Sequence, residues 1–173
     1  GIPFSSGKLY VEAKFNFSNG EYETAVKKLL NGLEQTSSKA SFYSLLAEIE
    51  QAKWNITLSL DYFRKANQED PYWQKPLVKI SQIEISNGNY DFAIAVLKLA
   101  EKLGGKTDLL ASGKSQYYSY RYQLEAAREE ASSVLKSNPN QFDMLVALGI
   151  VELKAGNNQG ALDYFVQALA IEP

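Results

Sequence analysis

Residues 141–173 decide the fold: they read QFDMLVALGIVELKAGNNQGALDYFVQALAIEP. Apolar and small residues recur at helical spacing in both halves of this stretch, at Leu145, Leu148, Gly149, Ala161, Phe165 and Ala168. Gly156-Asn157 lies between the halves and suits the end of a helix, because Gly and Asn accept left-handed backbone. Pro173 closes the stretch, which therefore predicts a helical hairpin with two apolar faces.

The same pattern recurs along the whole chain of 173 residues. Counting back from Pro173 in steps of 34 reaches Pro139, Gly105, Pro71 and Ser37. Pro and Gly are typical of the end of a helical unit. A leader or tag remnant is expected at residues 1–5. The predicted repeats, which need no insertion or deletion, are 6–39, 40–73, 74–107, 108–141 and 142–173.

Two positions of the repeat carry only small residues. The position eight residues into each repeat holds Ala13, Ala47, Ser81, Ser115 and Gly149. The position twenty residues in holds Ala25, Ser59, Ala93, Ala127 and Ala161. Small side chains let two helices cross closely, with axes roughly 8–10 Å apart. We therefore expect these two positions to lie where the helices of a hairpin meet.

On these residues the chain resembles the tetratricopeptide-repeat family over 6–173. Residues 142–173 follow the family pattern best, whereas Lys114 and Ala131 depart from it, since an apolar residue and an aromatic one are expected there. The resemblance implies an all-α fold, a right-handed superhelical solenoid of antiparallel helix pairs with about ten helices. Pentatricopeptide repeats, which bind RNA, have a similar period, but the acidic balance and the small-residue pattern favour the tetratricopeptide interpretation.

The composition argues against catalysis. The chain has no Cys and no His, which removes the thiolate and imidazole groups of many active sites and nearly all zinc sites. Glu50, Glu84 and Glu152 share one repeat position, which we interpret as structural or solvated. We predict no enzymatic activity, no catalytic residues, no cofactor and no metal.

Charge and hydropathy restrict the partners. A net charge of -2 argues against nucleic acid, and no apolar run is long enough for a membrane span. We expect a soluble chain, favour the cytoplasm, and expect a protein or peptide partner without membrane insertion. The segment Lys114–Tyr122, KSQYYSYRY, leaves three interpretations open. It could stack on single-stranded nucleic acid, pack its Tyr residues between hairpins, or form a hinge or dimer contact.

The resemblance places the binding site in a concave groove lined by the first helix of each repeat. The inward positions follow from helical spacing, and the residues we single out are Tyr10, Lys14, Glu48, Lys75, Lys79, Gln82, Gln116, Tyr120, Ile150 and Leu153. Other inward positions include Ser112, Ser119, Asp143, Val146, Ala147 and Lys154. Such side chains suit hydrogen bonding to an extended or helical peptide. The competing interpretation is a merely solvated face.

One known ligand of the family can be tested on the residues. Family members that grip the C-terminal carboxylate of heat-shock chaperones use a five-residue clamp of Lys, Asn, Asn, Lys and Arg. The matching positions here are Tyr10, Lys14, Leu45, Lys75 and Lys79. Only Lys75 agrees outright, and Lys79 keeps the charge without the planar fork of Arg. We therefore reject the full clamp.

We predict a non-catalytic adaptor or scaffold that binds a peptide or protein segment in the groove. The alternatives are a dedicated chaperone or assembly factor for a secretion or pilus-type machine, or a regulatory domain of a larger multidomain protein. The last repeat has an apolar inner strip at Val146, Ala147, Ile150 and Leu153 with no capping helix after it. Because terminal repeats need a polar cap, we expect the native protein to continue, or this end to self-associate or bind a partner.

Overall fold

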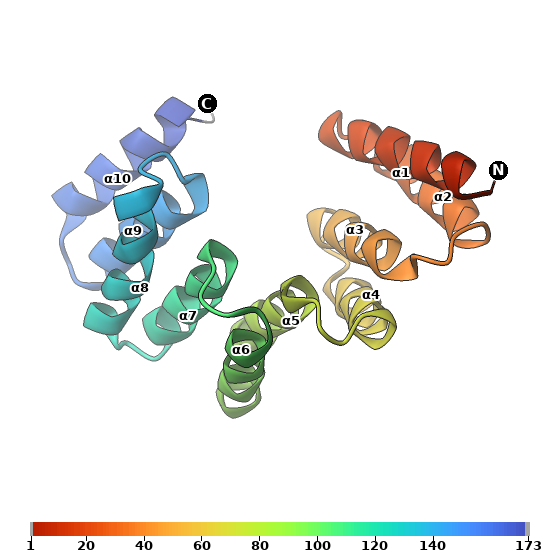
Figure 1. The fold of residues 1–173 in the computed structure, drawn as a ribbon. Coiled ribbons are helices and arrows are strands. Elements are labelled where there is room, and N and C mark those ends of the chain that lie inside the picture. Colours follow the sequence, from red (N-terminus) through yellow and green to blue (C-terminus); the bar gives the residue numbers. More distant parts are fainter. Residues whose placement is uncertain (1, 172–173) are drawn as a thin grey trace. The chain divides into compact units, whose positions relative to one another are not determined.

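The computed structural model describes residues 2–171, with side chains described for residues 5–171. No strand occurs in this range, and the two helices of each hairpin fold back on one another (Figure 1). The ten helices are α1 (Ile2–Ser18), α2 (Tyr22–Leu33), α3 (Lys39–Ala52), α4 (Ile56–Glu69), α5 (Gln74–Ser86), α6 (Tyr90–Gly104), α7 (Asp108–Tyr120), α8 (Leu124–Ser137), α9 (Phe142–Lys154) and α10 (Asn158–Ile171). The closing Pro173 and Gly1 of the expected leader lie outside the described residues.

The chain forms two compact units, Gly1–Pro76 and Leu77–Pro173. The first contains the hairpins α1–α2 and α3–α4, and the second contains α7–α8, α9–α10 and the packing of α5 on α6. The predicted all-α fold built from antiparallel helix pairs is confirmed. The first helices α5, α7 and α9 begin at Gln74, Asp108 and Phe142, while α1 begins at Ile2.

The small residues at repeat positions eight and twenty lie where the helices of a hairpin cross. All ten are buried. In the first unit, Ser59 Oγ donates across the hairpin to the Ala47 carbonyl oxygen at 2.8 Å. In the second, Ser115 Oγ donates to the Ala127 carbonyl oxygen at 2.9 Å. Position eight therefore faces position twenty, and one hydroxyl from either helix can bridge them.

The turn inside each hairpin requires left-handed backbone at one residue. Gly20, Gly88 and Gly156 fill this position in three repeats, with φ of 76°, 84° and 79°. The other two repeats have Trp54 at φ 63° and Tyr122 at φ 56°. Left-handed backbone brings Cβ close to the carbonyl oxygen in any residue except Gly. Trp54 and Tyr122 are nevertheless 85% and 72% exposed, so burial of their rings does not explain the strain.

A buried carboxylate anchors the same turn in three repeats. Glu50, Glu84 and Glu152 are buried near the ends of α3, α5 and α9. Each accepts a hydrogen bond from the side-chain amide of the Asn five residues later, at 2.6 Å from Asn55, 2.6 Å from Asn89 and 2.8 Å from Asn157. This repeated position is structural, in agreement with its interpretation from the sequence.

Candidate binding groove

The predicted groove residues fall in both units, and each unit is described by itself. In the first unit, the Tyr10 ring packs on Phe42 with centroids 5.2 Å apart. Burial, and then the nearby Glu48 carboxylate, raise the pKa of Tyr10. Glu48 forms an ion pair with Lys75, whose ammonium also lies 5.9 Å from the centre of the Trp73 ring. The charge of Lys75 is therefore balanced within its own unit. Lys14, the remaining predicted groove residue of this unit, is exposed.

In the second unit, five of the predicted residues line one pocket of about 240 Å³. They are Lys79, Gln82, Gln116, Tyr120 and Ile150. The remaining lining residues are Ser112, Ser115, Ser119, Asp143, Met144, Val146 and Ala147. The pocket thus joins the first helices α5, α7 and α9. The sixth predicted residue of this unit, Leu153, is 49% exposed and does not line it.

Two glutamines at equivalent repeat positions brace this pocket. Gln82 Nε2 donates to Ser112 Oγ at 2.9 Å. Gln116 Nε2 donates to the Gln82 carbonyl oxygen at 3.2 Å and reaches Ser86 Oγ at 3.4 Å. These bonds hold the two side-chain amides between α5 and α7.

Lys154 lies beside this pocket at the end of α9. Its Nζ donates to the Ser119 carbonyl oxygen at 2.9 Å. The ammonium also lies 4.6 Å from the ring centre of Tyr120 and 5.2 Å from that of Tyr122. No carboxylate of the described residues pairs with it, and burial lowers the pKa of Lys154.

Sequence reasoning placed Ser119 and Lys154 on the inner face without singling them out. Helical spacing gave their direction, but it carries no information on which polar atoms find a partner. The structure adds that information: Ser119 is 5% exposed, and its Oγ has no hydrogen-bond partner among the residues that the structure describes. The Gln82–Ser112 and Gln116–Gln82 hydrogen bonds could not be predicted from helical spacing either, because they depend on how successive repeats stack.

No family model matches the sequence, and no curated protein matches it in sequence. Solved structures do match its fold. TTC0263, a thermophilic TPR protein of Thermus thermophilus, superposes with a TM-score of 0.82 at 17% identity, covering 97% of this chain and 92% of that one. This is a tetratricopeptide-repeat fold.

Two further tetratricopeptide-like neighbours differ in their described roles. PilW, described as a widely conserved type IV pilus biogenesis factor, gives a TM-score of 0.77 at 16% identity, covering 96% of this chain and 77% of that one. YrrB, described as a TPR protein with an unusual peptide-binding site, gives 0.58 at 19% identity, covering 95% and 85%. At these identities the similarity establishes the tetratricopeptide-repeat fold, and the described roles belong to those proteins.

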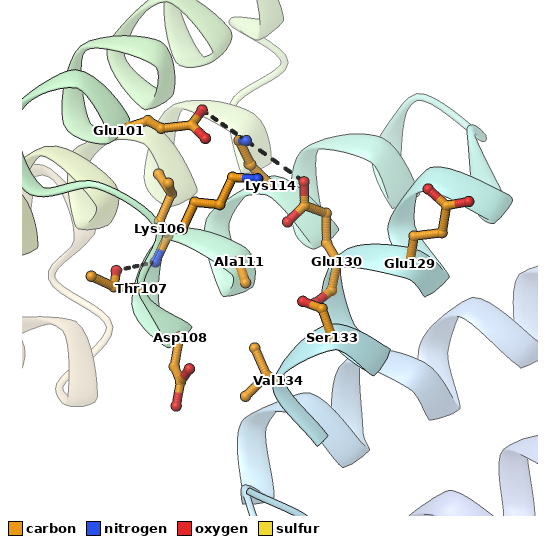
Figure 2. A pocket seen from close by; sticks show the side chains of 11 residues that line it. Glu101, Lys106, Thr107, Asp108, Ala111, Lys114, Glu129, Glu130, Ser133 and Val134 are labelled. Carbon is orange, nitrogen blue, oxygen red and sulfur yellow. Dashed lines mark hydrogen bonds and ion pairs between the residues drawn. The ribbon is translucent and has the colours of Figure 1, made fainter. Parts of the chain in front are cut away.

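The repeat that departs most from the tetratricopeptide pattern opens a second pocket, of about 400 Å³ (Figure 2). Lys114, at a position where the pattern has an apolar residue, lies between two carboxylates, 2.8 Å from Glu101 and 3.6 Å from Glu130. Ala111 lines the same pocket, at a position where four repeats have Leu or Tyr. The pocket therefore follows from a small residue in the core layer, and the charge of Lys114 is already compensated.

The aromatic segment Lys114–Tyr122 is divided among several contacts. Tyr117 packs against the core cluster of α5, α6 and α7. Tyr120 and Tyr122 flank Lys154, and Arg121 lies 5.3 Å from the centre of the Tyr90 ring. The basic and aromatic side chains therefore contact this unit itself, and the three interpretations of KSQYYSYRY stay predictions.

The last tetratricopeptide hairpin exposes apolar side chains. Ile150 and Leu153 on α9 are 42% and 49% exposed. On α10, Leu162, Val166 and Leu169 are each more than half exposed and fall at helical spacing. Self-association through this end stays a prediction. No helix in the described part of the chain has the length and apolar character to cross a membrane.

Proposed function

We propose that this chain is a non-catalytic adaptor or scaffold that binds a peptide or protein segment on the inner face of its first helices. The observation that carries the proposal is the pocket that spans α5, α7 and α9 and collects five of the residues selected from the sequence. It combines amide and hydroxyl groups with an aliphatic wall, which suits a peptide main chain with one anchoring side chain. The described peptide-binding site of YrrB supports the same type of ligand.

The residues of this pocket favour binding over catalysis. Its hydroxyl groups come from three serines and Tyr120, its amides come from glutamines, and no thiol or imidazole exists in the chain to activate a nucleophile. Within the described residues, no group of three or more acidic side chains could hold a metal ion.

The test is selection of peptides from a displayed random library on the whole chain, followed by affinity measurements on a matched pair of variants. Ile150→Glu places a charge on the pocket wall, whereas Leu99→Glu places the same charge at a similarly exposed site on α6. We expect Ile150→Glu to weaken binding of selected peptides about tenfold or more, and Leu99→Glu to leave it unchanged. Equal binding to both variants would move the site off this pocket.

A dedicated chaperone or assembly factor is the second candidate function. The observation that favours it is the fold similarity to PilW, a described pilus biogenesis factor. A chaperone keeps one unstable client soluble, whereas an adaptor binds partners that are stable alone. Co-expression of this chain with its captured partner separates the two: a partner that precipitates only when this chain is missing indicates the chaperone.

A further inference from the structure

Lys79 and Lys154 are the cations of the second unit that lack a carboxylate although they are half-buried. Four half-buried cations occur among its described residues. Lys114 pairs with Glu101 and Glu130, and Arg128 pairs with Glu125 and Glu152. Lys79 makes no ion pair with any described residue, and Lys154 has only a carbonyl oxygen and two aromatic rings around it. Both lie on the inner face, at α5 and at α9.

The surroundings of Lys154 leave its positive charge uncompensated. A carbonyl oxygen and the faces of aromatic rings supply only partial negative charge. They reduce the desolvation cost of the Lys154 ammonium, but they do not neutralise its charge. Tyr122 contributes one of the two aromatic rings beside Lys154. A carboxylate beside Lys154 would complete this arrangement.

The pocket that Lys79 lines, with Lys154 beside it, has a buried polar group without a hydrogen-bond partner among the described residues. Ser119 lines it, is 5% exposed, and its Oγ has no partner among the described residues. A buried hydroxyl without a partner is costly, and a carbonyl oxygen of a bound main chain would satisfy it. At about 240 Å³ the pocket is smaller than the roughly 300–1,000 Å³ of small-molecule sites. Its size suits one aliphatic side chain, against Val146, Ala147 and Ile150.

We propose that this pocket binds an internal segment of a partner protein in which two acidic side chains flank one aliphatic side chain. The two carboxylates pair with Lys79 and Lys154, the aliphatic group contacts Val146 and Ile150, and Ser119 donates to a main-chain carbonyl. Asp143 is the one acidic residue that lines the pocket, and it is exposed, so water and salt screen its charge. This inference rests on the proposed function and specifies the chemistry of the ligand.

The experiment selects peptides on the whole chain from a random library displayed inside a loop, so that no peptide has a free end. Selected sequences are synthesised with acetylated and amidated ends, and their affinities are measured by calorimetry. We expect enrichment of Asp or Glu on both sides of an aliphatic residue. Lys79→Gln and Lys154→Gln should each weaken binding about tenfold, or about 1.4 kcal/mol. Lys98→Gln and Lys136→Gln, which remove equally many charges at exposed sites, should not.

The Ser119→Ala variant distinguishes a loss of peptide binding from a loss of stability. It should weaken peptide binding while raising the thermal midpoint, because it removes a buried hydroxyl without a partner. Lys154→Gln also removes the bond to the Ser119 carbonyl, so its circular dichroism is compared with wild type. Lys79→Gln removes no hydrogen bond or ion pair to a described residue, so it keeps the test valid if the Lys154 variant unfolds.

Three outcomes overturn the inference. Selected peptides without acidic residues, bound equally by the two lysine variants, would refute it and leave the adaptor function standing. A gain of about tenfold or more when the amidated end is replaced by a free carboxylate would assign the lysines to a chain terminus instead. If no peptide is enriched on the wild-type chain, the proposed function fails and the inference fails with it.

Discussion

Asn157 binds Glu152 twice. Its backbone N–H donates to the Glu152 carbonyl oxygen at 2.9 Å, and its Nδ2 donates to Oε2 of the same residue at 2.8 Å. Arg128 Nε donates to the other carboxylate oxygen at 2.8 Å. One buried carboxylate thus joins the end of α9, the start of α10 and the neighbouring α8.

This arrangement predicts an acid-sensitive contribution to stability. The hydrogen bonds from Arg128 and then Asn157 hold the pKa of Glu152 below its ordinary value of 4.5. The contribution is therefore complete above about pH 4.5 and is lost as the pH falls through the folded-state pKa. Glu152→Gln should destabilise the chain at neutral pH, and the difference from wild type should shrink on acidification.

Urea unfolding at a series of pH values checks this prediction. Glu129→Gln is the matched control, because Glu129 is exposed in the same unit; it should unfold as the wild type does throughout. A difference between Glu152→Gln and wild type that stays constant down to acid pH would contradict the assignment.

Because Trp54 and Tyr122 have left-handed backbone, we expect Gly at either position to make the protein more stable than the native residue does. Trp54→Gly should raise the free energy of unfolding by about 0.5–1 kcal/mol, since Gly adopts φ 63° without strain. Gly88→Ala should lower it by about 1 kcal/mol, because nothing lies within 4 Å of the added Cβ and only the backbone is strained. Urea unfolding measures both, and a destabilised Trp54→Gly would show that the indole makes a stabilising contact.

The close crossing of α9 and α10 predicts that Gly149 has no room for a side chain. A Cβ at this position would overlap the Phe165 ring. Gly149→Ala should lower the free energy of unfolding by about 1–3 kcal/mol, the usual cost of overpacking. Gly7→Ala, inside α1 with nothing within 4 Å, should instead raise it by about 0.5–1 kcal/mol. Thermal unfolding of the two variants should therefore shift in opposite directions.

Phe63 is fully buried in the first unit. Phe63→Ala should lower the free energy of unfolding by about 3–5 kcal/mol, because it leaves a cavity that the hairpin cannot fill. Phe92→Ala is the control, since Phe92 is 51% exposed on α6. A loss below about 1 kcal/mol for Phe63→Ala would contradict its place in the core.

Periodicity predicted the hairpins because burial imposes it directly. Ala13, Ala25 and Phe63 are small or aromatic at fixed repeat positions for steric reasons, and all three are fully buried. The same logic predicted the direction of Gln82, Gln116 and Ile150, which meet at one pocket. Direction on a helix is a local property, so one sequence suffices to predict it.

Which lysines of the site form ion pairs could not be predicted from helical spacing. Lys75 and Lys79 look equivalent in sequence, one helical turn apart, yet Lys75 pairs with Glu48 and Lys79 pairs with no described residue. Lys114 looks like a break in the repeat pattern but lies between Glu101 and Glu130. Each outcome depends on a residue in another helix, and periodicity contains no information on such pairs.

The hydroxyl bridges of Ser59 and Ser115 limit how repeats of this chain can be recombined. In one hairpin the second helix supplies the serine, and in the other the first helix does. A chimera of α3 with α8 would bring Ala47 against Ala127 and have no bridging hydroxyl, while α7 with α4 would bring two serines together. For these two hairpins the unit to exchange is therefore the whole hairpin, because each contains one bridging hydroxyl and a swap of single helices would leave none or two.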